Sequence, residues 1–323
     1  MIKFLLIGVG VLVLSMLLLL IVMGLLPLSR DQMDSVPGPF ADYGEAVARF
    51  DEILEVESGV VNDASGSLLF THGEPTQRVY LLVHGTTNSP RQWEELGTQL
   101  HGRGHNVLIL RMPYHGLQSH SVRELGQLQP QDLRRYADEA VDIASALGDE
   151  VVVGGISGGA AVAAWMAQNR AEVDRALLLA PFFGIYGVPS AVTPLLANAF
   201  ARLPNIVLDN PLEPRRDWVY RGQATRGVAA FLALGQEVLQ GSHAGRFPAG
   251  ELIVLTTAVD DNANNDSTSA LLDLWRSSGT RITEFNFEQS LDIPHNSVDP
   301  SADPQKKQMV YEKMLELVGE NTR

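Results

Sequence analysis

A serine in a glycine-rich pentapeptide is the first group in this chain that could act as a nucleophile. Residues 155–159 read G-I-S-G-G and match the pattern G-x-S-x-G, with Ser157 at the centre. The pentapeptide lies between a β-branched run at 151–153 and an alanine-rich run at 160–168, which predicts a sharp turn from a strand into a helix. Glycines suit such a turn because the backbone passes close to its neighbours. We interpret Ser157 as a nucleophile rather than an incidental serine in a turn.

A second motif could stabilise the negative charge that such a nucleophile creates. A tetrahedral oxyanion needs at least two preorganised donors, supplied in this arrangement by the backbone N–H after the nucleophile and one from the loop after an earlier strand. The run H-G-T-T-N at 84–88 follows an apolar strand pattern. We therefore expect Gly158 and Thr86 to form the oxyanion hole. His84 and His115 are expected to brace their turns rather than to act as bases.

The elements around these motifs alternate between short apolar runs and helical patterns, which predicts a mostly parallel sheet with helices on both faces. The fold class is therefore α/β. The expected strands are 79–83, 107–110, 151–153, 176–179, 252–256 and 281–287, and the expected helices include 91–102, 131–147, 160–168 and 271–276.

The alternation stops between residues 180 and 250, where the chain is rich in proline and bulky apolar residues. An insertion at this point would lie over the carboxyl ends of the strands, where α/β folds bind ligands. We interpret residues 182–210 as a small cap. Its apolar residues Leu195, Leu196 and Phe200 are candidates for substrate binding, and the alternative is that they only pack against the domain.

Four motifs of this chain occur in the order in which the α/β-hydrolase superfamily has them. The chain therefore resembles this superfamily, and within it bacterial carboxylesterases and monoacylglycerol-lipase-like serine esterases. The motifs are the run that begins H-G-T-T-N, the G-I-S-G-G turn, T-T-A-V-D-D-N-A-N-N-D at 256–266 and I-P-H-N-S at 293–297. The resemblance covers residues 78–319. It implies an α/β-hydrolase fold and a catalytic triad in the chain order Ser, Asp, His.

The resemblance assigns the general base to His295, which is the only histidine after His243. The acid is one of two adjacent carboxylates, Asp260 and Asp261. In the family an apolar residue commonly follows three positions after the acid, and Ala263 meets this condition for Asp260. We therefore expect the triad Ser157, Asp260 and His295.

These groups predict hydrolysis of carboxylic esters through an acyl-enzyme, with no cofactor and no metal. The expected substrate is a small-molecule ester or a lipid. Thioesterase, amidase and C–C hydrolase activities use the same machinery and remain alternatives. A membrane-tethered binding protein that kept the fold without turnover is the alternative outside the enzymes.

Composition excludes several other classes. The 323 residues are 45% hydrophobic and 19% charged, which indicates a folded chain with a large core. A net charge of −14 repels phosphate backbones, so nucleic acid is not an expected partner. The chain has no cysteine, which removes disulfides and thiolate chemistry. The sequence does not indicate an oligomeric state.

The apolar residues concentrate at the N-terminus, where residues 4–26 contain no charge. A helix of this length spans a hydrocarbon core of roughly 30 Å, whereas a signal peptide has an apolar stretch of about 7 to 15 residues. We expect a transmembrane anchor at 1–30, a linker at 31–39 that contains S-V-P-G-P, and a hydrolase domain at 40–323. Lys3 and the terminal amine precede the apolar stretch, whereas Arg30 follows it beside Asp31 and Asp34, so the positive charges favour a domain on the non-cytoplasmic side.

Overall fold

The computed structural model describes residues 2–26, 31–248 and 250–320. Seven strands in this part of the chain form one sheet in the order β1-β3-β2-β4-β5-β8-β9, and every neighbouring pair is parallel except β1 with β3. Parallel neighbours place the carboxyl ends of β2, β4, β5 and β8 at one edge. The strands are β1 Leu68–Phe70, β2 Thr76–Val83, β3 Asn106–Ile109, β4 Gly148–Ile156, β5 Val173–Leu179, β8 Glu251–Thr257 and β9 Ile282–Phe287.

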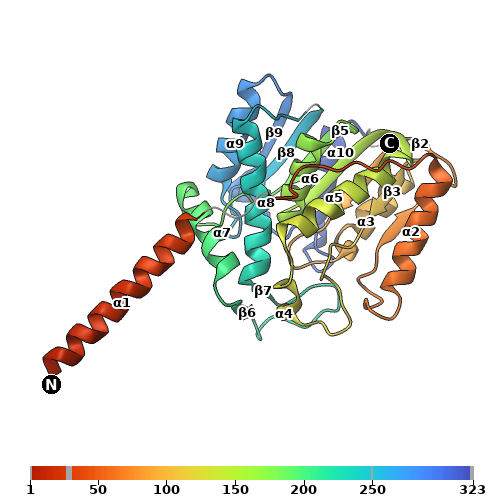
Figure 1. The fold of residues 1–323 in the computed structure, drawn as a ribbon. Coiled ribbons are helices and arrows are strands. Elements are labelled where there is room, and N and C mark those ends of the chain that lie inside the picture. Colours follow the sequence, from red (N-terminus) through yellow and green to blue (C-terminus); the bar gives the residue numbers. More distant parts are fainter. Residues whose placement is uncertain (1, 27–30, 249, 321–323) are drawn as a thin grey trace.

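Helices cover both faces of this sheet (Figure 1). Alternate residues of β2 point to opposite sides, so Val79 and Leu81 join one core while Tyr80 and Leu82 join the other. The first core is formed with α2, α5, α6, α8 and α9, and the second with α3 and α10. The helix bounds are α2 Tyr43–Glu57, α3 Glu94–His101, α4 Val122–Leu125, α5 Pro130–Ser145, α6 Gly158–Asn169, α7 Thr193–Arg202, α8 Thr225–His243, α9 Asn265–Ser277 and α10 Pro304–Leu317.

This architecture confirms the expected α/β-hydrolase fold with a mostly parallel sheet. Each expected strand is present. The strands expected at 79–83, 151–153 and 176–179 begin three residues earlier in the structure. Three short strands have no counterpart in the expectation: β1 of the main sheet, and β6 Val207–Asp209 and β7 Gly222–Ala224. The residues of these three strands are mostly only partly buried or exposed. The strands therefore lack the continuous apolar run by which the buried strands were predicted.

The segment between β5 and β8 forms a cap and one core helix. Helix α7 lies within the expected cap at 182–210, and β6 pairs with β7 in a separate two-stranded sheet. Because β7 ends at Ala224, this small sheet extends past the expected boundary. Helix α8 then returns to the main domain, where Phe231 and Leu234 are buried.

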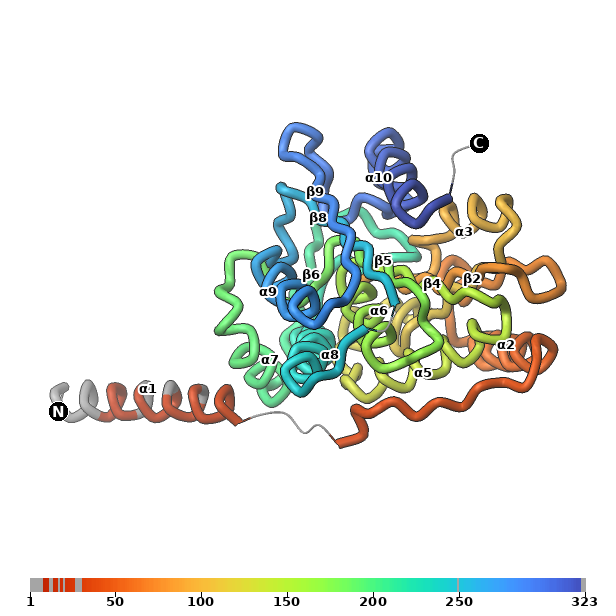
Figure 2. The backbone as a smooth tube through the Cα atoms, turned by 90° about the horizontal axis from the view of Figure 1, so that it is seen from above, coloured from red at the N-terminus to blue at the C-terminus, as the bar shows by residue number. Residues whose placement is uncertain are grey.

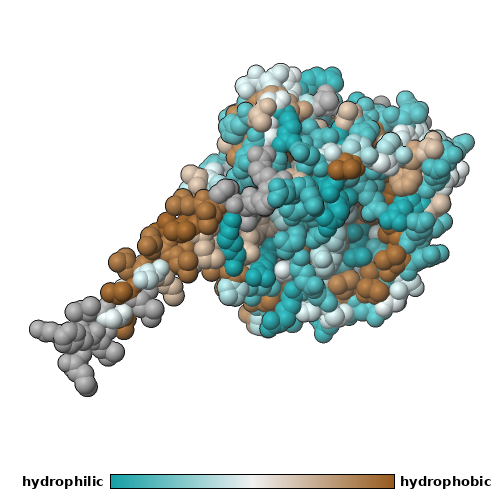
Figure 3. Space-filling view, viewed as in Figure 1, coloured by the Kyte–Doolittle hydropathy of each residue, from teal (hydrophilic) through white to brown (hydrophobic). Residues whose placement is uncertain are grey.

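One described helix, α1 Ile2–Leu25, is long and apolar enough to cross a membrane, and a signal sequence would meet the same criteria. It projects away from the domain, and the space-filling view shows a mostly apolar surface on its described part next to the domain (Figures 1 and 3). Its last turn contacts α7, where Asn198 Nδ2 donates to Gly24 O at 2.7 Å and Arg202 donates to Met23 O at 3.0 Å. Residues 1 and 27–30 of the expected anchor, including Arg30, lie outside the described residues, as do residues 321–323 of the expected domain.

The segment at 31–39, which we expected to be a linker, is hydrogen-bonded to the domain. Its Met33 is buried, and Ser35 Oγ and Gly38 N donate to Asp138 and Asp142 on α5 at 2.6 and 2.9 Å. Both carboxylates also pair with the fully buried Arg170. Figure 2 shows the segment running along α5 towards α2. The two prolines and the glycine correctly predicted that this segment forms neither a helix nor a strand. Hydrogen bonds to a helix a hundred residues away cannot be predicted from such a local pattern.

Candidate active site

Ser157 lies on the sharp turn between β4 and α6. Its backbone has φ 57° and ψ −121°, a conformation that a non-glycine residue adopts only where the surroundings enforce it. A side chain at Gly155 would overlap the backbone of Gly159, and one at Gly159 would overlap the carbonyl oxygens of Val83 and His84. The two glycines therefore permit the turn, as the pentapeptide predicted. The turn is held against β5 because Ser157 N–H donates to Leu179 O at 3.0 Å.

His295 and Asp260 form a buried pair at the same edge of the sheet. His295 Nδ1 lies 2.8 Å from Asp260 Oδ2, and each residue is 5% exposed. Asp260 Oδ1 accepts the backbone N–H groups of Asn262 and Ala263 at 2.9 and 2.8 Å. Burial opposes ionisation of this carboxyl, but the hydrogen bonds from His295 and the two backbone groups outweigh it and lower the pKa of Asp260. Asp260 is therefore held as a carboxylate beside the imidazole.

The neighbouring Asp261 does not contact the imidazole. Its Oδ1 accepts a hydrogen bond of 2.6 Å from Asn262 Nδ2, and the residue is exposed. The structure thus brings Asp260 to His295, and Ala263, three residues after Asp260, is buried and bonded back to it.

Ser157 and His295 line one cavity of about 310 Å³. With Nδ1 engaged by Asp260, the imidazole has Nε2 available for the serine hydroxyl. Apolar side chains from the cap and α8 line part of the cavity. Polar side chains from the loops after β2, β8 and β9 line much of the rest, with Gln223 of β7 and the carboxylate of Asp261. The apolar wall consists of Phe182, Ile185, Phe200, Leu208 and Val228.

The expected oxyanion donors, Thr86 and Gly158, are neighbours beside Ser157. Gly158 is the first residue of α6, and the first N–H groups of a helix have no partner within it. A side chain at Gly158 would overlap Thr86 and approach Phe231, so only glycine brings this N–H so close to the β2 loop. Thr86 also lines the cavity. The helix N-terminus adds positive potential where an oxyanion would form.

Two buried histidines hold the loop that carries Thr86. His84 Nδ1 donates to Gly85 O at 3.0 Å, and its Nε2 accepts Met112 N–H at 3.1 Å. His115 Nε2 lies 2.9 Å from Thr86 O and its Nδ1 lies 2.8 Å from Pro113 O. Burial lowers the pKa of His84 well below its ordinary value and the pKa of His115 to about 4. Both rings are neutral at pH 7 and brace turns, as the sequence indicated.

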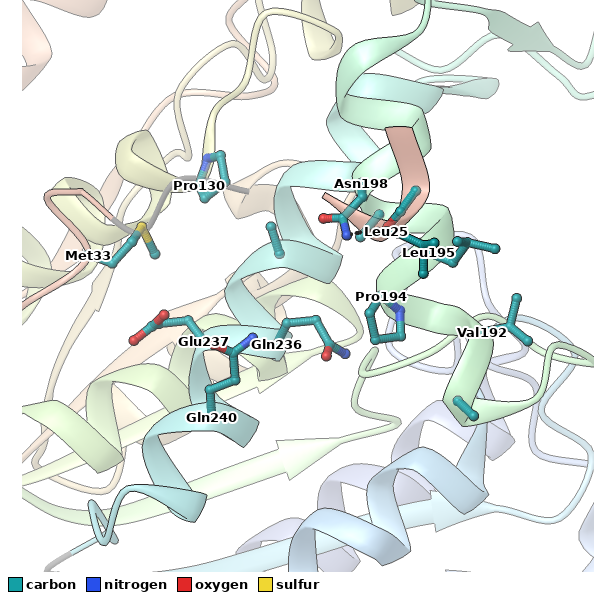
Figure 4. Close-up of a pocket in the computed structure, with 14 residues that line it drawn as sticks. Leu25, Met33, Pro130, Val192, Pro194, Leu195, Asn198, Gln236, Glu237 and Gln240 are labelled. Atoms are coloured by element: carbon teal, nitrogen blue, oxygen red, sulfur yellow. Dashed lines mark hydrogen bonds between the residues drawn. The ribbon is translucent and has the colours of Figure 1, made fainter. Parts of the chain in front are cut away.

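The three cap residues expected to bind substrate face different ways. Phe200 lines the cavity of Ser157, whereas Leu195 and Leu196 do not. Leu195 lies in a separate cavity of about 430 Å³ between α7, α8 and the end of α1 (Figure 4). It is close enough to α1 that a side chain on Gly24 would overlap it. Of the three expected residues, the structure thus places only Phe200 against the space that Ser157 faces.

Four other apolar wall residues were absent from the sequence-based expectation. Phe182 and Ile185 follow β5 at the carboxyl edge of the sheet, and this position was a signal that could have identified them. Leu208 lies on the unexpected strand β6 and Val228 on α8. No local pattern distinguishes these two from other apolar residues, because only the return of the cap over the sheet brings them to Ser157. Among the described residues, no group of three His, Asp or Glu side chains is arranged to hold a metal ion.

Comparison with known proteins identifies the family. Residues 80–285 match the model of the alpha/beta hydrolase family, and the chain belongs to this family. The match confirms the resemblance that the four motifs indicated. A search of curated proteins finds no match.

Solved structures of similar fold include lipases and esterases. A structure from work on LipS and LipT, two metagenome-derived lipolytic enzymes, has a TM-score of 0.60 and 17% identity, over 81% of this chain and 100% of that one. The monoglyceride lipase of Saccharomyces cerevisiae has a TM-score of 0.57 and 13% identity, over 80% and 91%. The monoacylglycerol lipase of Paleococcus ferrophilus has a TM-score of 0.54 and 16% identity, over 77% and 98%. At these identities the likeness shows that the fold is shared.

Proposed function

We propose that this protein is a membrane-anchored serine hydrolase that cleaves carboxylic esters through the triad Ser157, His295 and Asp260. The observation that carries the proposal is the hydrogen bond between Asp260 and His295 at a cavity that also contains Ser157 on a strained turn. A carboxylate, an imidazole and a hydroxyl in this arrangement are what nucleophilic acyl transfer requires.

Each group has one role in the proposed reaction. Ser157 Oγ attacks the ester carbonyl while His295 Nε2 takes its proton. Asp260 fixes the tautomer with hydrogen on Nδ1 and stabilises the imidazolium that forms. The N–H groups of Gly158 and Thr86 bind the oxyanion, and each such donor typically contributes about 10²- to 10³-fold to the rate. His295 then protonates the leaving alcohol, and water hydrolyses the acyl-enzyme by the same steps.

The apolar wall supports an ester with an aliphatic or aromatic acyl group. Five apolar side chains line the cavity of Ser157, and burial of each methylene of an acyl chain contributes about 0.8 kcal/mol. A lipid ester or another uncharged small-molecule ester fits this wall better than a charged acyl group, which would be desolvated without a partner.

The test of the proposed chemistry uses Ser157→Ala. We expect the wild-type protein to hydrolyse short p-nitrophenyl esters and to be labelled by a fluorophosphonate at Ser157. The variant should lose both properties while its circular dichroism spectrum and melting temperature stay close to wild type. Residual hydrolysis within about tenfold of wild type would contradict the serine mechanism, since removal of a triad nucleophile typically costs about 10⁶-fold.

Helix α1 supports membrane attachment, with the domain on the non-cytoplasmic side as the proposed orientation. Two truncations test this. Removal of residues 1–30 should release a folded domain into the soluble fraction, because the bound segment 31–39 is retained. Removal of residues 1–39 also exposes the buried pair of Asp138 and Arg170 and should lower the melting temperature further. If the protein is expressed with residues 1–30 and is recovered without them in the soluble fraction, a signal peptide is favoured instead.

A further inference from the structure

A second cavity adjoins the catalytic one, and most of the residues that line it have polar or charged side chains. It has a volume of about 450 Å³, and we call it the polar cavity. One part of its wall comes from residues 213–223, which lead into β7. Another part comes from residues 294–302, around and after His295. It shares five lining residues with the cavity of Ser157: Thr87, Asn88, Gln223, Asn262 and Asn296. The two cavities are therefore immediate neighbours, and a ligand bound at Ser157 lies next to the polar cavity.

The position of His295 decides which part of an ester would enter the polar cavity. In acyl transfer the imidazole gives its proton to the leaving oxygen, so that oxygen lies beside the ring. The next residue, Asn296, lines both cavities. None of the five apolar wall residues lines the polar cavity. The acyl group therefore lies on the apolar wall, and the alcohol part extends past Asn296.

The charges around the polar cavity favour an uncharged ligand with many hydroxyl groups. Two acidic residues, Glu213 and Asp299, balance two basic residues, Arg216 and Arg221. Asp299 is occupied by Asn88 and Ser301, and Arg221 pairs with Asp209 at 3.3 Å.

Several side chains in the polar cavity remain available to a ligand. Among the described residues Arg216 and Glu213 have no ion-pair partner, and the Asn296 amide makes no hydrogen bond. Arg216 offers several donors, and Asn296 offers both donors and an acceptor. Hydroxyl groups can satisfy both kinds of partner, which an anion cannot.

The volume of the polar cavity exceeds what a short alcohol would fill. About 450 Å³ corresponds to roughly fifteen water molecules at their liquid volume. Methanol or ethanol would leave most of this space hydrated and Arg216 without a contact. A six-carbon sugar fits the space and presents hydroxyl groups in several directions.

We propose that the polar cavity is a binding site for a sugar-sized, uncharged polyhydroxy alcohol, which is the leaving group of the preferred ester substrates. The proposal rests on the proposed ester hydrolysis. The bond from Ser157 Oγ to the acyl carbon forms and the bond from that carbon to the sugar oxygen breaks. The proton that His295 took from Ser157 passes to the sugar oxygen. Arg216 and Asn296 contact the remaining hydroxyl groups and determine specificity.

The test compares octanoyl esters of glucose, glycerol and ethanol, which share one acyl chain. The full-length protein is purified in a detergent without a sugar headgroup, so that the detergent does not compete. We expect kcat/KM for the glucose ester to exceed that for the ethyl ester by about tenfold or more, the effect of one or two hydrogen bonds to a charged group. Arg216→Ala should remove most of this advantage. Arg215→Ala is the matched control, because Arg215 lines a different cavity.

A binding measurement separates this proposal from the proposed function. Calorimetric titration of the Ser157→Ala variant with the same esters needs no turnover. The glucose ester should bind this variant about tenfold more tightly than the ethyl ester. The difference should be lost in the double variant that also carries Arg216→Ala. Equal affinity for the two esters would overturn the sugar site even if both are cleaved in the wild type. Equal losses from Arg215→Ala and Arg216→Ala would overturn it as well. Failure of fluorophosphonate labelling with the affinity difference intact would instead contradict only the serine chemistry.

Discussion

Asn88 donates a hydrogen bond of 2.7 Å from its amide to the carboxylate of Asp299, and this contact joins the loop after β2 to the loop that carries His295. Both residues are buried. Asn88 Oδ1 accepts the N–H of Ser89, and Asp299 Oδ1 accepts the N–H and hydroxyl of Ser301, so each partner is also fixed within its own loop. The contact therefore sets the position of Thr86 relative to the imidazole.

Loss of this contact is expected to affect both stability and catalysis. Asn88→Ala leaves a buried carboxylate with one partner fewer and should lower the free energy of unfolding by about 1–3 kcal/mol. It should also lower kcat by roughly tenfold, because small displacements of catalytic groups are costly. Urea denaturation and ester hydrolysis measure the two effects. In a double-mutant cycle with Asp299→Asn, strictly additive changes would show that the two loops are not coupled through this contact.

The pairing of Asp260 with His295 predicts unequal effects of two neighbouring substitutions. Asp260→Asn should lower kcat by about 10³- to 10⁴-fold, because an amide in this place favours the wrong tautomer of the imidazole. Asp261→Asn should change kcat far less, since Asp261 contacts Asn262 and not the ring. Kinetics with one p-nitrophenyl ester at pH 7.5 compare the two variants. If Asp261→Asn has the larger effect, the role belongs to Asp261.

The orientation of the cap helix predicts which residue recognises the acyl chain. Phe200→Asp should lower kcat/KM for octanoate esters by roughly 10- to 100-fold more than for acetate esters, because burial of a large apolar side chain contributes about 1.5–3 kcal/mol. Leu195→Asp is the matched control on the same helix, and it should not change the ratio. A chain-length series on the purified variants gives the result. Equal losses for acetate and octanoate would mean that Phe200 does not contact the acyl chain.

The buried His115 predicts a pH dependence of stability on the acidic side. The unfolded chain binds a proton at this residue with a pKa of about 6.5, whereas burial lowers the folded pKa to about 4. Between these values the unfolded state binds more protons, so stability rises with pH and is lost as pH falls from 6.5 to 4. The loss approaches about 3 kcal/mol at the acidic end.

His115→Gln keeps a donor for Thr86 O but does not titrate. Urea denaturation of wild type and variant between pH 7.5 and 4.5 should therefore show a smaller decrease for the variant. Parallel pH curves would contradict a neutral, buried His115.

The sequence by itself determined the features that depend on short stretches of chain. The alternation of apolar runs and helical patterns located six strands of the main sheet along the chain, because burial on both faces of a parallel sheet requires continuous apolar strands. The spacing in 155–159 located the strained turn at Ser157, since only glycines permit its close backbone contacts. The absence of any other histidine after His243 left His295 as the single candidate at the last motif.

Only the tertiary structure decided the features that depend on contacts between distant segments. Two adjacent carboxylates are equivalent in a sequence, but the fold of the loop after β8 directs Asp260 to His295 and leaves Asp261 exposed. Leu195 and Phe200 belong to one apolar helix, and the packing of α7 between α1 and the domain turns them to different cavities. Hydrogen bonds from 31–39 to α5 likewise form across a hundred residues of chain. Local spacing encodes the shape of a turn or helix, whereas the partner of each side chain is set by the packing of the whole domain.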